Sequence, residues 1–511
     1  MTHFKKITIL IFNLIHSSFF LLISGLASLY IYFFLWLLAK NLLGNKLASL
    51  LNLFPERFQI IQLASYYLFF FFALTLFWAI RQSQKGLIKP IFWFWAIFFF
   101  FSFSFILITT PPLTSQDVFL SLFHGRIFSY YRQNPYLVAP QNFLGDPFSE
   151  SVQDWLEGGT CYGPIWTLLV SAISFLFPNS FFLQLLSLRI FLLVIFCLLI
   201  IFLIKIIYRH RPNWAFPLFI LLAWQPFLLI ETINNAHFDI LVGFTVLLGL
   251  YFVSQNHYLK GFMALWLGFL LKYIPLLLLP LGIRFLFSQK DKKTAFQITL
   301  KTIAIIVLLT IIAYLPFGYS MFQPKTPFGR SSSLNIWLLP FSPFFSFTNL
   351  PPIPFFSTLL GMPILGIALN IETISKLHSA PWFNFQTPIE SLANTVRFLS
   401  LAIYLIFYLW LIFRPFQDKR ELFKRGFWIL ALYLLICAFW FMAWHLIWAF
   451  PLAIAAGLLP TLIILGWSLL SFPYPFPALY YGSVFVLPLI LLAKSLKKII
   501  KFNFLEWEHS K

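Results

Sequence analysis

The chain has 511 residues, of which 60% are hydrophobic and only 10% are charged. Soluble domains carry about a quarter charged residues, so this composition excludes a soluble globular fold, and its apolar content excludes a disordered chain. The formal net charge of +20 indicates basic cytoplasmic loops rather than a nucleic-acid partner. Long unbroken apolar runs favour helices over the short alternating strands of a membrane barrel. The sequence therefore predicts an all-α polytopic membrane protein.

The apolar segments predict about 13–14 transmembrane segments. In chain order they lie near 7–39, 60–80, 91–109, 184–208, 214–230, 239–254, 260–273, 275–287, 299–317, 394–413, 426–442, 446–459, 461–473 and 478–496. The first is about twice as long as the apolar region of a secretory signal and has no small-residue cleavage site, so we expect a retained helix. Prolines in the shorter segments, such as Pro275, indicate broken or paired half-helices.

Basic residues give the orientation of these segments. With the N-terminus inside, 24 of the 35 Lys and Arg residues fall on the cytoplasmic side, so both termini are predicted to be cytoplasmic. This topology requires residues 163–177 to form a short helix lying in the outer interface rather than a span. It also places 318–393 outside, with a second interfacial helix at 355–371.

Three parts of the chain follow from this topology. Residues 1–90 form two additional N-terminal helices, and residues 288–511 form a C-terminal membrane module that contains the outer loop 318–393. Between them, residues 91–287 form a module with the outer loop 110–161, followed by the 163–177 helix. Ten of the 15 acidic residues fall outside, and five of these lie in the 110–161 loop, so we expect the functional site at the outer face.

Asp117 begins an amphipathic stretch directly after a membrane segment. Apolar residues at helical spacing follow it, which predicts a short interfacial helix with Asp117 near its N-terminus. An aspartate there can simply cap the helix, and the local pattern does not separate capping from chemistry. His124, Arg126, Asn134 and Tyr136, further along, equally fit a structured loop.

A set of short motifs resembles a known family of membrane enzymes. The motifs are Asp117-Val118, Gly125-Arg126, Asn134-Pro135-Tyr136, Pro140 and Tyr162-Gly163-Pro164, then residues 234–239, 270–275 and 441–451. Together they resemble the polyprenyl-phosphate-mannose-dependent mannosyltransferases of the GT-C glycosyltransferase superfamily, over roughly residues 91–500. Asp-Val stands where some relatives carry Asp-x-Asp, which weakens the case for an acidic pair that binds metal.

The resemblance implies a GT-C-like fold and a glycosyl transfer with inversion at the outer membrane face. The implied donor is a polyprenyl-phosphate hexose, mannose above all, and the acceptor is a glycolipid, a polysaccharide or a protein. The position that matches Asp117 serves as general base in this superfold, and a carboxylate suits removal of the acceptor hydroxyl proton. The resemblance also assigns substrate binding to Asn134, Tyr136, Tyr162 and Arg189, the last as an interface anchor or a phosphate contact.

The leaving phosphate requires cationic or hydrogen-bonding partners. The candidates are Lys272, Arg126, Arg330 and His445. Lys272 lies in a turn of an otherwise apolar hairpin, where a charge is costly and therefore a functional candidate, although it can also extend to the outer interface. For Arg126 the alternative is an ion pair with Asp146 or Glu150.

His237 and Asp239 lie two residues apart at the start of a helix, where both can face an outer cavity. Asp239 could bind sugar hydroxyls, orient His237 or cap the helix. With the nearby Glu231 the pair could bind a divalent metal, but no tight ligand motif is present, so we expect no cofactor.

Two other functions compete with the enzyme. A transporter or flippase of a lipid-linked or small solute is the main alternative, although transporters place ionisable residues near the bilayer midplane and often show repeated halves. A polymerase or ligase of cell-surface polysaccharide is the third. In each case the protein is expected in the plasma (inner) membrane, with the lipid bilayer as a partner.

Overall fold

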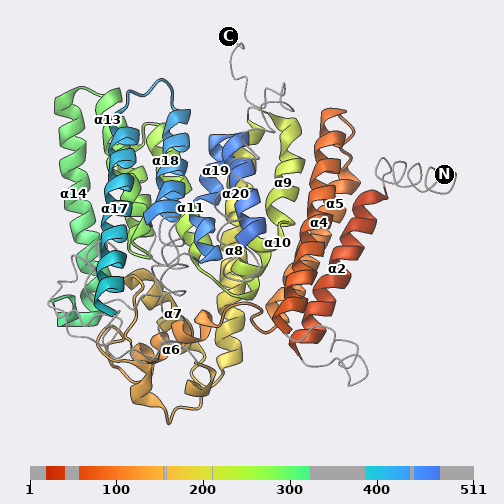
Figure 1. The fold of residues 1–511 in the computed structure, drawn as a ribbon, viewed down its shortest axis with the longest axis horizontal. Helices are drawn as coiled ribbons and strands as arrows, with labels where there is room; N and C mark the ends of the chain where they lie inside the picture. Colours follow the sequence, from red (N-terminus) through yellow and green to blue (C-terminus); the bar gives the residue numbers. More distant parts are fainter. Residues whose placement is uncertain are drawn as a thin grey trace. The chain divides into compact units, whose positions relative to one another are not determined.

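The computed structural model describes residues 19–40, 57–322 (apart from 153–155, 157 and 210), 386–437 and 442–471. Every regular element in these residues is helical, which confirms the all-α prediction. Contacts divide the chain into two compact units built from interleaved stretches (Figure 1). Unit 1 takes residues up to Phe119 and from Asn179 to Ile240, and unit 2 takes most of the remainder.

In the described residues, unit 1 contains four long helices of 20–28 residues and four short ones. They are α2 (Phe20–Ala39), α4 (Arg57–Gln84), α5 (Pro90–Thr109), α8 (Phe181–Tyr208), η3 (Pro212–Trp214), α9 (Ala215–Ala223), α10 (Pro226–Leu229) and the π-helix η4 (Ile230–Asn234). Helices α6 (Asp117–Ser129) and α11 (Asp239–Ser254) start in this unit and continue in unit 2.

Unit 2 contains shorter and more broken helices. They are η1 (Pro140–Phe143), η2 (Ser149–Ser151), α7 (Pro164–Leu176), α12 (Tyr258–Phe269), η5 (Ile274–Leu278), α13 (Leu279–Gln289), α14 (Lys292–Tyr314), η6 (Leu315–Phe322), α17 (Gln386–Phe413), α18 (Arg420–Leu432), η9 (Tyr433–Cys437), η10 (Ala443–Trp448), α19 (Phe450–Ala456) and α20 (Leu458–Ser471). The helix predicted at 163–177 is present as α7.

Five helices of the described residues are long and apolar enough to cross a membrane, or six if the bent pair Pro212–Ala223 and Pro226–Asn234 counts as one span. Six further apolar helices have 10–17 residues, among them α7 and α11. The chain is therefore a membrane protein with many apolar helices. The predicted segments at 355–371 and 478–496 lie outside the described residues, and the total of 13–14 spans stays a prediction.

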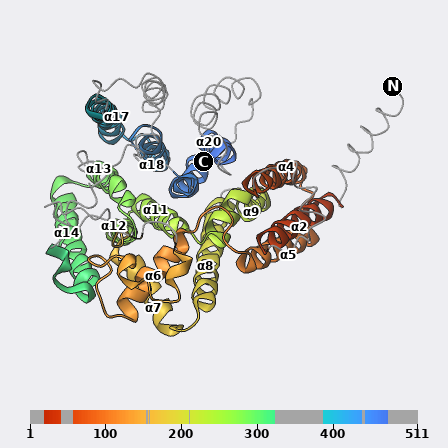
Figure 2. The same cartoon turned by 60° about the horizontal axis from the view of Figure 1, so that its bottom comes forward.

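Aromatic packing joins α2, α4 and α5, which lie side by side in both views of unit 1 (Figures 1 and 2). A Cβ on Gly25 would overlap the ring of Phe99, so only glycine lets α2 approach α5 this closely. Trp224 packs 5.3 Å from Phe103, and its indole nitrogen donates to the carbonyl of Ala96. The buried polar atom is thus satisfied, and Trp224 is held against α5.

In unit 2, α6 and α7 pack against each other at close range. A Cβ on Gly125 would lie 2.5 Å from the carbonyl oxygen of Val170, so the two helix backbones touch. Apolar side chains on one face of α6, including Phe123 and Ile127, are fully buried, as the helical spacing predicts.

Candidate functional site

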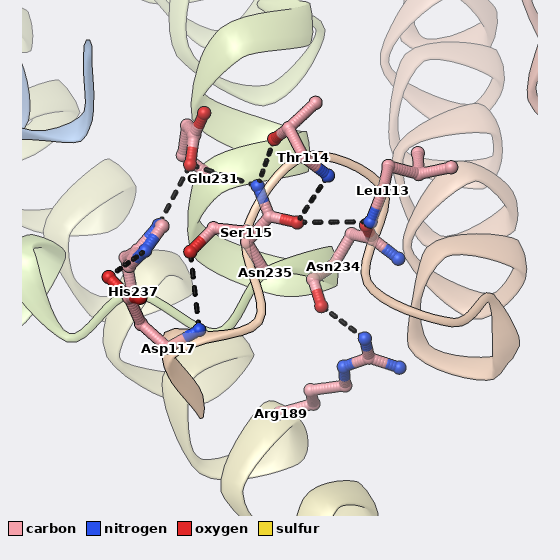
Figure 3. Close-up of polar contacts among 9 residues, drawn as sticks. All are labelled: Leu113, Thr114, Ser115, Asp117, Arg189, Glu231, Asn234, Asn235 and His237. Atoms are coloured by element: carbon pink, nitrogen blue, oxygen red, sulfur yellow. Dashed lines mark hydrogen bonds and ion pairs between the residues drawn. The ribbon is translucent and has the colours of Figure 1, made fainter. Parts of the chain in front are cut away.

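The loop of residues 110–116 joins α5 to α6 and carries the chain to Asp117. Asn234, in the π-helix η4, binds this loop from both ends of its amide. Its side-chain nitrogen donates at 3.0–3.1 Å to the backbone carbonyls of Leu107, Thr110 and Pro111. Its side-chain oxygen accepts from the backbone nitrogen of Leu113 at 2.8 Å. One fully buried asparagine therefore fixes the start of the loop (Figure 3).

Asn235 fixes the next part of the same loop. Its side-chain oxygen accepts from the backbone nitrogens of Leu113 and Thr114 at 3.2 and 3.3 Å. Its amide nitrogen donates to the Thr114 hydroxyl at 2.6 Å and to Glu231 Oε2 at 3.0 Å. Asn235 is also fully buried, so these bonds form away from water and are costly to break.

Arg189 supports the asparagine pair (Asn234 and Asn235) from α8. Its guanidinium donates to the backbone carbonyls of Ile108 and Thr110 at 2.6 and 2.8 Å, and to the carbonyl of Asn234. The Arg189 side chain is 2% exposed. The carbonyls that it binds lie at helix ends, where the last carbonyl groups have no hydrogen-bond partner within the helix. The structure thus shows Arg189 bound to backbone carbonyls, and its two suggested roles, interface anchor and phosphate contact, stay predictions.

Glu231 and His237 form a buried contact beside this loop. Glu231 Oε2 lies 2.8 Å from His237 Nδ1, and both side chains are less than a tenth exposed. The backbone nitrogen of His237 also donates to the Glu231 carbonyl at 2.9 Å. Ala236, between them, has φ of +56°, a left-handed conformation that non-glycine residues adopt at a cost.

Asp117 is the first residue of α6, and its carboxylate faces the other ring nitrogen of His237. Asp117 Oδ2 lies 4.0 Å from His237 Nε2, and the aspartate side chain is 29% exposed. Asp239, two residues after His237, begins α11 and is buried. The predicted residues Asp117, His237 and Asp239 therefore lie in unit 1, and the first two face each other.

The described part of the chain has no group of three or more His, Cys, Asp or Glu side chains arranged to bind a metal ion. Glu231, His237 and Asp239, weighed above as a ligand set, do not form one.

Lys272 forms a second cluster, in unit 2, with two aromatic rings. Its ammonium nitrogen lies 4.7 Å from the ring centre of Trp448 and 5.9 Å from that of Tyr162. Such contacts attract the cation to the ring faces and are worth most where water is excluded. His445 stacks on Trp448 at 4.3 Å, and its Nδ1 accepts from the backbone nitrogen of Met442. The predicted residues Lys272, Tyr162 and His445 are thus connected through Trp448, which the site prediction did not include.

Gly163 fixes the turn that carries Lys272. Its backbone nitrogen donates to Leu271 at 2.9 Å, and that of Ile165 donates to Leu270 at 3.1 Å. A Cβ on Gly163 would lie 2.5 Å from the carbonyl carbon of Leu270, so no larger residue fits without moving the turn. The N-terminus of α7 is therefore joined directly to the turn between α12 and η5.

Arg126 pairs with Asp146, as the alternative to phosphate binding anticipated. The guanidinium Nε lies 2.6 Å from Asp146 Oδ2, and the Tyr131 hydroxyl donates to the same oxygen at 2.6 Å. Burial alone would raise the pKa of Asp146, but the bonds from Tyr131, Arg126 and the backbone of Phe148 lower it below its usual value. Arg126 also lies 4.2 Å from the ring centre of Tyr130. A phosphate contact of Arg126 stays a prediction.

Asn134 and Tyr136 bind other parts of the protein. The Asn134 amide donates to the carbonyl of Phe317 at 2.7 Å. The Tyr136 hydroxyl donates to the carbonyl of Tyr162 at 3.0 Å, and burial raises the pKa of this phenol well above its usual value. Their substrate contacts stay predictions, and Arg330 lies outside the described residues.

The residues that position the predicted site residues were not recognised from the sequence. Asn234 and Asn235 were noticed only as part of a motif, and Glu231 only as a potential metal ligand. The signal was present, because three polar residues within an apolar stretch predict a buried network.

Comparison with known proteins gives the family. Residues 26–288, just over half of the chain, match the family model of the alpha-(1->6)-mannopyranosyltransferase N-terminal domain. The match begins within α2 and includes both residue clusters described above, apart from His445 and Trp448. No curated protein and no solved structure matches the chain.

The all-helical membrane fold and the match to this family model together identify the protein as a membrane glycosyltransferase. The chain belongs to the MptA/B family of alpha-(1->6)-mannopyranosyltransferases, a polyprenyl-phosphate-mannose-dependent family of the GT-C superfamily.

Proposed function

We propose that this enzyme transfers mannose from a polyprenyl-phosphate donor to a hydroxyl of an acceptor at the outer face of the plasma membrane. Asp117 is the general base, and the configuration at the anomeric carbon inverts. The acceptor oxygen bonds to C1 of the sugar as the bond from C1 to the phosphate oxygen breaks. The acceptor proton passes to the Asp117 carboxylate, and polyprenyl phosphate leaves.

The placement of Asp117 is the observation that carries this proposal. The carboxylate is partly exposed in the first turn of α6, so it can meet a substrate hydroxyl. The backbone that leads to it is bonded through Leu113 and Thr114 to buried side chains. A base held in this way loses little entropy when the acceptor arrives, and such positioning is a large part of catalytic power.

Lys272 is the proposed partner of the leaving phosphate. Its ammonium group lies against the ring faces of Tyr162 and Trp448, which attract a cation. An ammonium group can donate hydrogen bonds to the phosphate oxygens, on which negative charge develops as the C1–O bond breaks.

Mannosyl transfer in isolated membranes tests the proposal. Labelled polyprenyl-phosphate-mannose is supplied, and label in the acceptor product is compared between the wild type and Asp117→Asn. We expect the variant to lose activity by about 10²–10⁴-fold, because an amide cannot accept the proton. Glu150→Gln, a change at an exposed acid of the outer loop, is the control and should keep wild-type activity. Full activity of a correctly inserted Asp117→Asn variant would show that Asp117 is not the base.

The transporter alternative predicts a different result. Purified protein in liposomes would then take up solute with no donor consumed, whereas the proposed enzyme consumes donor and forms product in proportion.

A further inference from the structure

Glu231 is a buried carboxylate to which the proposed reaction gives no task. Its side chain is 2% exposed, in a π-helix turn within an apolar part of the chain. A buried carboxylate is costly unless donors surround it. One of its oxygens, Oε2, accepts hydrogen bonds from both Asn235 and His237. Asn235 binds the loop that leads to Asp117, and His237 faces the Asp117 carboxylate.

The first connection runs through Asn235. An ionised carboxylate can only accept hydrogen bonds, so Asn235 must present its NH₂ group to Glu231. The side-chain oxygen of Asn235 then necessarily faces the backbone nitrogens of Leu113 and Thr114. The two backbone donors require the same orientation, so Glu231 and the loop before Asp117 hold the Asn235 amide from its opposite ends.

The second connection runs through His237. The same acceptor-only carboxylate requires the proton of His237 to be on Nδ1, which lies 2.8 Å away. The ring is thereby held with Nε2 directed at Asp117 Oδ2, 4.0 Å away. A histidine whose tautomer and orientation are set by a carboxylate is a recurring arrangement behind reactive groups.

We propose that Glu231 is a positioning residue for the catalytic base, acting on Asp117 through Asn235 and through His237. The inference rests on the proposed function, because it gives Glu231 the task of orienting Asp117, the general base proposed above. Glu231 itself takes no proton from the substrate.

The isosteric variant Glu231→Gln tests this inference. A glutamine amide can donate as well as accept, so the tautomer of His237 is no longer determined, and the Asn235 amide loses the acceptor-only partner of its NH₂ end. With Asp117 misplaced by about 1 Å, we expect kcat to fall by about 10²-fold, with KM for the donor changed by less than about threefold. Glu231→Asp keeps an acceptor-only carboxylate, so its kcat should be at least about tenfold higher than that of Glu231→Gln. Glu150→Gln is the matched control, since it makes the same change at an exposed site.

A double-mutant cycle with Asp117→Asn separates positioning from general stability. If Glu231 acts through Asp117, adding Glu231→Gln to Asp117→Asn costs no further activity, because the base is already absent. A further loss of about 10²-fold in the double variant, or an aspartate variant no better than the glutamine variant, would overturn the inference. Wild-type kcat in Glu231→Gln beside an inactive Asp117→Asn refutes only this inference, whereas a fully active Asp117→Asn refutes the proposed base.

Discussion

Gly163 is the position where the smallest substitution should have the clearest effect. It precedes α7, and its backbone nitrogen donates to Leu271, next to Lys272. Gly163→Ala adds a single methyl group, which would lie 2.5 Å from the carbonyl carbon of Leu270. Favourable carbon–carbon contacts lie at about 3.5–4.0 Å, so the two backbones must separate by about 1 Å.

That separation breaks two hydrogen bonds. The bonds from Gly163 to Leu271 and from Ile165 to Leu270 are 2.9 and 3.1 Å long, and about 1 Å more takes them beyond hydrogen-bonding range. At about 1 kcal/mol each, their loss lowers the free energy of unfolding by about 2 kcal/mol. The same movement takes Lys272 away from the Tyr162 ring, so we expect KM for the donor to rise by about tenfold.

Two measurements on the detergent-purified protein check this expectation. The free energy of unfolding follows from denaturant titration, and KM follows from transfer of labelled mannose. Gly145→Ala is the control, because a Cβ on Gly145 meets no atom within 4 Å. If Gly163→Ala and Gly145→Ala behave alike in both measurements, the close contact does not hold the Lys272 turn and the reasoning is wrong.

Two further predictions concern pH and topology. Burial lowers the pKa of His124 to about 4 from 6.5, so the unfolded chain takes up this proton first as pH falls. Stability should decrease from pH 6.5 towards 4, by up to about 3 kcal/mol, and His124→Gln should flatten this slope in thermal unfolding scans. Cys161 is exposed and lies in the predicted outer loop, so an impermeant thiol reagent should label it in intact cells and not label Cys161→Ser. Labelling of Cys161 only after cell lysis would contradict the orientation.

Much of the fold follows from hydrophobicity alone, because an apolar stretch of about 20 residues has few alternatives to a helix. The predicted segments 91–109 and 184–208 appear as α5 and α8 with ends shifted by only a few residues. The expected break at Pro275 is also present, since η5 (Ile274–Leu278) separates α12 from α13. Here a proline that cannot continue the helical hydrogen bonds gave the signal.

The site was predictable in part. Asp117 stood out because it begins the outer amphipathic helix and matches the general-base position of the family that the sequence resembles. Lys272 stood out because a charge in an apolar hairpin is costly. The aromatic contact of Lys272 with Trp448 joins residues far apart in the chain, and no sequence period links them. Likewise, the sequence left two alternatives for Arg126, a contact with the phosphate and an ion pair with Asp146 or Glu150. Only the three-dimensional structure shows the short bond to Asp146.

The geometry of His237 shows why the remainder needed a structure. Along a regular α-helix, side chains six residues apart differ by about 120° in direction and about 9 Å along the axis, so continuing helical periodicity would separate His237 from Glu231. Instead, η4 adopts a π-helix and Ala236 takes a left-handed φ of +56°, which returns His237 to Glu231. Such a residue costs about 1–3 kcal/mol, and the two bonds between His237 and Glu231, at about 0.5–1.5 kcal/mol each, are of similar size. The chain keeps this strain beside Asp117, where relaxing it into a regular helix would turn the histidine away from the base.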